Sequence, residues 1–72
     1  MALNYAYHYA EIDLETNMCM GVQTTTREID VSRYPDLVEI PVYDEEYVFK
    51  YYIDGNWYED AEATIPWTSS LL

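Results

Sequence analysis

The chain has 72 residues, which is enough for one small domain and no more. Fourteen acidic residues against three basic ones give a formal net charge of −11, and the basic residues Arg27, Arg33 and Lys50 are scattered. Direct binding to nucleic acids or anionic membranes is therefore not expected, because both need clustered positive charge. Half of the residues are hydrophobic and 17% are aromatic, which excludes a disordered acidic tail.

A domain this small has a thin margin of stability and usually gains support from a disulfide, a metal ion or self-association. Cys19 is the only cysteine, so no disulfide can form within the chain. One cysteine and one histidine do not supply the four ligands of a zinc site, and we expect neither a metal nor a cofactor. Self-association, or docking on another protein, remains as the expected source of support.

The sequence shows no targeting signal. No basic region followed by an apolar stretch stands at its start, and no uncharged apolar run approaches the ~18 residues of a membrane span. We therefore expect synthesis in a reducing cytoplasm and no membrane insertion.

The first third of the chain predicts a hairpin. Residues 3–14 alternate between bulky residues such as Tyr7 and Tyr9 and smaller ones such as Ala10 and Ile12, and this period of two is typical of a strand. We expect the small side chains to pack on another layer and the tyrosines to be partly solvated. A polar loop of about four residues leads to a second strand over residues 18–26, in which Gly21 indicates a bulge or a close backbone approach.

The middle of the chain has a weaker pattern. Residues 28–31 are compatible with a short strand, and residues 32–36 form a connector. Residues 37–43 predict a strand at a sheet edge, because Pro41 cannot donate to a ladder. Asp44 is a predicted helix N-cap followed by two acids that suit a first turn, so one or two helical turns are expected, reaching Phe49.

The clearest local signal is the stretch Lys50–Glu59. Asp54-Gly55 is a favoured central pair of a type I′ turn, since both positions need a positive φ. With Asp54-Gly55 as the turn, Lys50 lies opposite Glu59 and forms an opposite-charge pair. A type II′ turn on Gly55-Asn56 would lose this pair, so we prefer the type I′ register. It predicts the cross-strand pairs Ile53 with Asn56, Tyr52 with Trp57, Tyr51 with Tyr58, and Lys50 with Glu59.

These elements together predict a mainly β domain over residues 1–63. It is a small antiparallel sheet of two hairpins, with four or five strands and one short helix before the second hairpin. Residues 64–72 are predicted to be an apolar C-terminal tail. A sheet of this size has exposed edges, which many proteins cover by pairing with a neighbour.

Catalytic chemistry finds little support in the sequence. His8 and Cys19 invite a nucleophile–base interpretation, but the predicted hairpin sets Cys19 opposite Ile12 or Asp13. At ~3.3 Å per residue, His8 is then roughly 13–16 Å away, far beyond hydrogen-bond reach. The acidic runs near Asp44 and Asp60 lack the spacing of a calcium-binding loop. We expect no catalytic residue and predict that the chain is not an enzyme.

The aromatic residues are the candidate interaction site. One face of the central hairpin must be buried, because small β domains fill their cores with aromatic side chains. The other face is a candidate contact surface, since tyrosine and tryptophan are enriched at interfaces, and which face is buried stays open. The candidate residues are Tyr51, Tyr52, Trp57, Tyr58 and Trp67.

Three segments share a pattern with a known family: Tyr9–Asp13 followed by Cys19, Gly21 and Val22; Ile40–Glu45; and Tyr51–Tyr58. They resemble the opening, the middle connector and the closing hairpin of small tail-associated structural proteins of phages and prophages of Gram-positive bacteria. The resemblance implies a phage or prophage protein made in the cytoplasm of a bacterial host and associated with the tail in the virion. It supplies no catalytic residue.

These observations favour a non-enzymatic structural or interaction protein. It would act through its aromatic hairpin and sheet edges, as a homo-oligomer or docked on another tail component. One alternative is an acidic decoy that imitates the charge of DNA and inhibits a host nucleic-acid-binding protein, although the acids cluster at turns rather than in rows. A second alternative, a small carbohydrate-binding module, depends on the aromatic residues alone.

Overall fold

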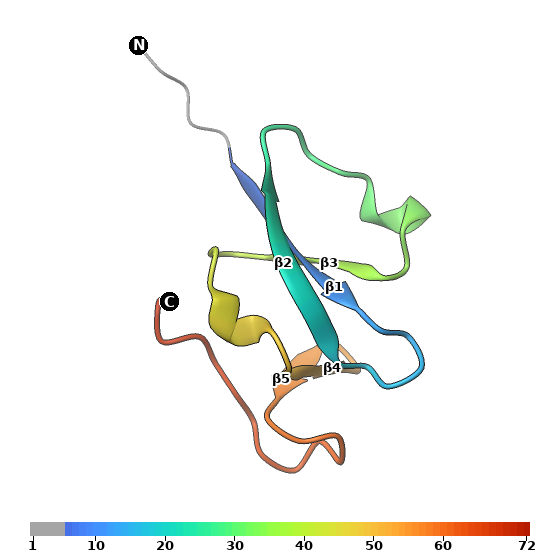
Figure 1. Ribbon diagram of the computed structural model, residues 1–72, viewed down its shortest axis with the longest axis vertical. Coiled ribbons are helices and arrows are strands. Elements are labelled where there is room, and N and C mark those ends of the chain that lie inside the picture. Colours follow the sequence, from blue (N-terminus) through green and yellow to red (C-terminus); the bar gives the residue numbers. More distant parts are fainter. Residues whose placement is uncertain (1–5) are drawn as a thin grey trace.

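The computed structural model describes residues 6–72, and the mainly β prediction is confirmed in this range (Figure 1). The strands form two antiparallel sheets, one with the order β2-β1-β3 and the other a β4-β5 hairpin. The helical elements of these residues are single 3-10 turns. In chain order the elements are β1 (Tyr7–Ile12), β2 (Cys19–Thr25), η1 (Val31–Arg33), β3 (Leu37–Ile40), η2 (Glu45–Tyr47), β4 (Tyr51–Ile53) and β5 (Asn56–Tyr58).

The first hairpin has the predicted loop and the predicted bulge. The Asp13 N–H donates to the Met18 carbonyl at 2.8 Å and closes the loop 14–17. The register between β1 and β2 shifts at Met20, next to Gly21, which marks the bulge. A Cβ atom at Gly21 would meet nothing within 4 Å, so the bulge and not a close approach accounts for this position. The part of the predicted strand at residues 3–5 lies outside the described residues.

The two faces of β1 are both covered. Ala10 and Ile12 are buried as expected, in a core that also contains Cys19, Ile40 and Tyr47. The expectation of a partly solvated tyrosine face is wrong for Tyr9, which is 0% exposed. Its hydroxyl accepts a hydrogen bond from the Ile29 N–H at 2.7 Å, because the segment between β2 and β3 folds over this face.

The short strand compatible with residues 28–31 does not form. The Ile29 N–H bonds to the Tyr9 hydroxyl and not to a neighbouring strand, and Val31 already belongs to η1. The Asp30 carboxylate caps this turn by accepting the Ser32 N–H at 3.1 Å. β3 follows and ends at Ile40, so the predicted edge strand is present but stops before Pro41.

The predicted N-cap is confirmed, but the helix is shorter than expected. The Asp44 carboxylate accepts the Glu46 N–H at 2.9 Å, and η2 ends at Tyr47. Phe49 then adopts a positive φ of 75°. The chain must leave helical geometry here, because the Phe49 N–H donates to the Cys19 carbonyl at 2.8 Å and lies beside the start of β2.

The central hairpin forms in the predicted register, with Tyr51 opposite Tyr58, Tyr52 opposite Trp57 and Ile53 opposite Asn56. Asp54 and Gly55 have φ values of 51° and 83°, as a type I′ turn requires. The expected Lys50–Glu59 ion pair is absent from the described part of the chain. Lys50 Nζ instead lies 5.0 Å from the centroid of the Trp67 ring, a cation–π arrangement.

The C-terminal segment 64–72 packs on the rest of the domain. The Trp67 N–H donates to the Trp57 carbonyl at 3.0 Å, so this segment runs along the outer edge of β5. The Ser69 hydroxyl donates to the Asp44 carboxylate at 2.5 Å. Figure 1 shows the segment, in red, passing from β5 up to the side of η2.

The two glycines provide a matched test of the turn. Gly55→Val forces a β-branched residue to a φ of 83° and should lower the free energy of unfolding by about 1–2 kcal/mol. Gly21→Val adds the same side chain in open space on a strand and should have little effect. Urea denaturation of both variants measures the difference, and equal losses would contradict the turn assignment.

Candidate interaction surface

An aromatic cluster joins three separate elements. Tyr47 from η2 is 2% exposed, and the rings of Trp57 and Trp67 each lie 4.8 Å from it, centroid to centroid. Their interplanar angles of 68° and 81° are edge-to-face, which is the favourable arrangement of the ring quadrupoles. Tyr52 extends the cluster, with its ring centroid 5.0 Å from that of Trp57.

The structure brings three of the five predicted interaction residues together. Tyr52, Trp57 and Trp67 are half-buried and pack against the core. Tyr51 and Tyr58 are also half-buried, but they form a pair on the opposite face of the hairpin, because side chains alternate along a strand. The face of the hairpin that carries Tyr52 and Trp57 is therefore the one that covers the core.

A shallow groove of about 260 Å³ lies between the hairpin and the C-terminal segment. Trp57 and Trp67 are among its apolar lining residues, and Asn56 adds a polar group at the tip of the hairpin. Leu72 lines the groove from the C-terminal segment and is 66% exposed. Concave apolar surfaces with a few polar groups are typical of binding sites.

A buried carboxylate fixes one wall of this groove. The Asp44 side chain accepts the Ser69 hydroxyl and the Glu46 N–H, so it ties the C-terminal segment to η2. The hydrogen bond from Ser69, and next the one from Glu46, hold the pKa of Asp44 below its ordinary value of 3.8, because both stabilise the charged form. The contact between Asp44 and Ser69 at this wall of the groove therefore favours the ionised form of Asp44.

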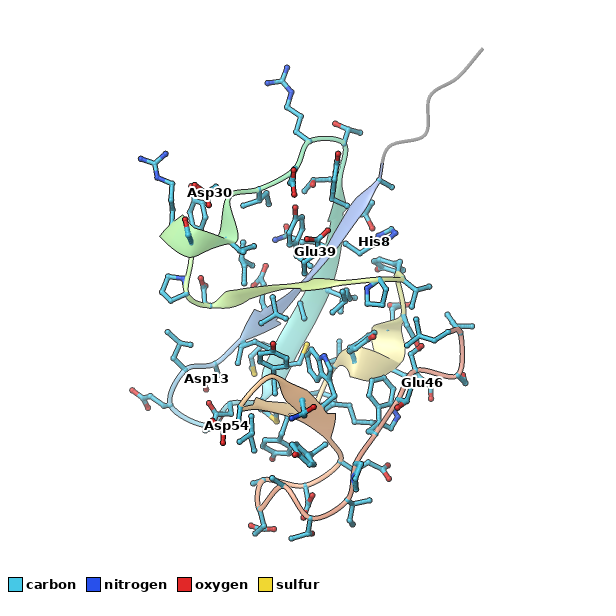
Figure 2. The ribbon with its side chains drawn as sticks, turned by 180° about the vertical axis from the view of Figure 1, so that it is seen from behind. His8, Asp13, Asp30, Glu39, Glu46 and Asp54 are labelled. Carbon is cyan, nitrogen blue, oxygen red and sulfur yellow. The ribbon has the colours of Figure 1, made fainter. Side chains whose placement is uncertain are left out.

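Other carboxylates also stabilise turns. Asp13 accepts the Glu15 N–H at 2.9 Å, and Asp60 accepts the Ile65 N–H at 2.9 Å. The pKa of Asp60 is lowered, first by the Thr64 hydroxyl. Figure 2 shows the labelled acids distributed around the molecule on different elements rather than in one row.

His8 and Cys19 are separate, as expected. His8 lies opposite Thr24, and its Nδ1 atom is 2.8 Å from the Thr24 hydroxyl. Cys19 lies opposite Ile12 and is fully buried, and burial raises the pKa of its thiol. A neutral, inaccessible thiol is a poor nucleophile.

Residues 6–72 contain no metal-ligand cluster and no helix suited to spanning a membrane. No group of three or more histidine, cysteine or acidic side chains is placed to hold a metal ion. None of the helices in this range has the length and apolar character needed to cross a bilayer.

Sequence reasoning missed two residues that matter here. Tyr47 was expected only as part of a short helix, whereas it is the centre of the cluster. The Asp44 cap places it at the end of η2, but its burial depends on Trp57 and Trp67, which are distant in sequence. Phe49 is 66% exposed at a positive φ, and no local signal predicts this, because phenylalanine rarely adopts it.

No family model matches the chain, and comparisons with curated proteins and with solved structures found no similar protein or fold. The function must be inferred from the residues and their geometry.

The aromatic cluster should be essential for stability. Trp67→Ala removes contacts with Tyr47 and Lys50, and we expect it to lower the free energy of unfolding by roughly 2–3 kcal/mol, somewhat less than the ~3–5 kcal/mol of a fully buried tryptophan. Ile65→Ala, at an exposed position of the same segment, should cost under about 0.5 kcal/mol. Chemical denaturation followed by circular dichroism compares them, and similar costs would show that Trp67 does not anchor the segment.

Asp44 should make stability depend on pH in acid. Its pKa is lower in the folded chain than in the unfolded one, so its contribution is complete well above pH 3.8 and disappears as the pH falls through the folded value. Asp44→Asn should therefore lower the melting temperature at pH 7 and differ progressively less from the wild type below about pH 4. Glu62→Gln removes one exposed charge and serves as the control. A difference in melting temperature between Asp44→Asn and the wild type that stays the same at every pH would contradict this role of Asp44.

Proposed function

We propose that the chain is a non-enzymatic structural and interaction protein associated with the tail of a phage or prophage of Gram-positive bacteria, and that it binds a protein partner through the aromatic groove. The observation that carries the interaction part is the pair of half-exposed tryptophans, Trp57 and Trp67, held side by side on Tyr47. The tail association is supported by the resemblance of the segments Tyr9–Asp13, Ile40–Glu45 and Tyr51–Tyr58.

The groove suits binding because its aromatic side chains are held in place before a partner arrives. Tyr47 packs against both tryptophans, the Trp67 N–H bonds to the Trp57 carbonyl, and Ser69 bonds to Asp44. A surface with immobilised side chains loses little conformational entropy on association. Rigid tryptophans in a partly desolvated groove are typical of the residues that dominate binding energy.

The alternatives have less support. A decoy of DNA needs free carboxylates in rows, but Asp13, Asp30, Asp44 and Asp60 accept hydrogen bonds from their own turns. A carbohydrate-binding module is favoured by one observation, which is the combination of tryptophans with the polar side chain of Asn56 in the groove. It ranks second, and NMR titration of the tryptophan side-chain N–H signals with cell-wall oligosaccharides would detect it.

Association with the virion is tested by two matched leucine variants. Leu72 lines the groove and Leu71 does not, although both are about equally exposed. Leu72→Asp places a charge in the groove and should reduce the amount of protein in purified virions about tenfold, whereas Leu71→Asp should leave it unchanged. Quantitative mass spectrometry of purified virions measures the amounts of the wild type, Leu72→Asp and Leu71→Asp.

Two results would contradict the proposal. If the wild-type protein is absent from purified virions, the tail association is wrong. If both leucine variants are incorporated like the wild type, the groove is not the binding surface.

A further inference from the structure

The edges of the second sheet are both covered within the chain. On the outer side of β4, the Tyr52 N–H donates to the Asn17 carbonyl at 2.9 Å. On the outer side of β5, the Trp67 N–H donates to the Trp57 carbonyl at 3.0 Å. Neither strand offers an open ladder to another chain.

The two edges of the first sheet differ from each other. β3 is four residues long, carries Glu39 and ends before Pro41, and such short, charged, proline-limited strands resist pairing. β2 is the longest strand of the described residues. Only Cys19, at its start, bonds to a second neighbour, the segment at Phe49 and Lys50. From Met20 to Thr25, its described hydrogen bonds between backbone groups go to β1 alone.

The open backbone groups of β2 can be identified from the pairing of β1. Successive residues of a strand direct their N–H and C=O groups to alternate sides. The Ile12 N–H donates to the Asp36 carbonyl on the β3 side. Tyr9 lies three positions earlier in β1, so its backbone groups point to the opposite side and bond to its partner Gln23 in β2. The neighbours of Gln23, which are Val22 and Thr24, therefore direct their backbone groups away from β1.

Charge indicates what pairs with this edge. Residues 17–26 carry no charged side chain, although 24% of the chain is charged and the net charge is −11. Like charges placed opposite each other destabilise a strand pair, so two copies of this chain can approach at an edge only where the edge is neutral. A basic partner would instead favour an edge lined with acids. The neutral edge thus fits a second copy of the same chain.

Two exposed apolar side chains lie at the margin of this edge. Met20 begins the open part of β2, and the Phe49 N–H bonds to Cys19, where the covered part ends. Both side chains are largely exposed, and Phe49 keeps its exposed position at a positive φ that costs free energy. Pairing at β2 gives these side chains apolar surface to bury.

We propose that β2 pairs antiparallel with β2 of a second copy about a two-fold axis near Gln23, which joins two three-stranded sheets into one six-stranded sheet. This inference rests on the proposed function as an interaction protein and names the chain itself as one partner. Val22 and Thr24 form the intermolecular ladder, and the groove at Trp57 and Trp67 stays free for a different protein.

A proline and an alanine at one position test the pairing. Thr24→Pro removes the outward N–H, while Thr24→Ala removes the same side chain and its contact with His8 but keeps the N–H. In sedimentation experiments the wild type and Thr24→Ala should be dimers with dissociation constants within about threefold of each other. Thr24→Pro should be at least tenfold weaker. A monomeric wild type, or a Thr24→Pro dimer as tight as that of Thr24→Ala, would overturn the proposal.

Amide exchange of the wild type decides the case even if Thr24→Pro fails to fold. The amides of Val22 and Thr24 should exchange slowly in concentrated protein and quickly on dilution. Those of Gln23 and Thr25, which face β1, should be protected in both conditions. Fast exchange of Val22 and Thr24 in a concentrated dimer would place the interface elsewhere.

The two proposals can fail independently. A monomeric protein that is still found in virions would overturn only the pairing of β2. A dimer with a protected Val22 amide that is absent from virions would overturn only the tail association.

Discussion

The burial of Tyr47 is the interaction on which the rest of the structure depends. Its ring belongs to the core with Ala10, Ile12 and Cys19 of the first hairpin, and it packs edge-to-face on Trp57 and Trp67. A two-stranded hairpin such as β4-β5 is marginal in water without a layer to pack on. Tyr47 supplies that layer, so it joins two small sheets into one domain that lacks a disulfide within the described chain.

The backbone turns around Tyr47 follow from this burial. Asp44 caps η2 on one side of the ring, and on the other side Phe49 takes a positive φ so that Lys50 can run beside Cys19. The strain at Phe49 persists because the hydrogen bonds with Cys19 and the burial of Tyr47 hold both ends of the segment. The exposed phenyl ring is thus a consequence of how the core is closed, and it lies next to the neutral edge of β2.

Local chemistry made part of the fold predictable from sequence. The Asp54-Gly55 turn, the Asp44 cap and the bulge near Gly21 each depend on residues within a few positions of one another, and all three are present. The errors arose where a distant segment decides the outcome. Tyr9 is buried because Ile29 lies over it, and the same contact prevents a strand at 28–31.

The candidate site was predictable only in part, for the same reason. Tyr52 and Trp57 are paired by the local turn, so their proximity follows from sequence. Trp67 joins them only through Tyr47 and the Trp57 carbonyl, contacts that no pattern of period two or 3.6 contains. The apolar content of residues 64–72 indicated a contact, but not that the contact is made within the chain.

The distribution of charge separates the surfaces of this domain by role. Carboxylates cap the turns, where ionised Asp44 and Asp60 hold the C-terminal segment and keep the groove in shape. The net charge of −11 repels other copies of the chain over most of the surface. The proposed pairing would restrict association between copies to the neutral strand β2, and the general repulsion would help to select this edge by disfavouring the rest. Under this proposal, the acids that weaken the compact state of so small a domain would also limit how its copies assemble.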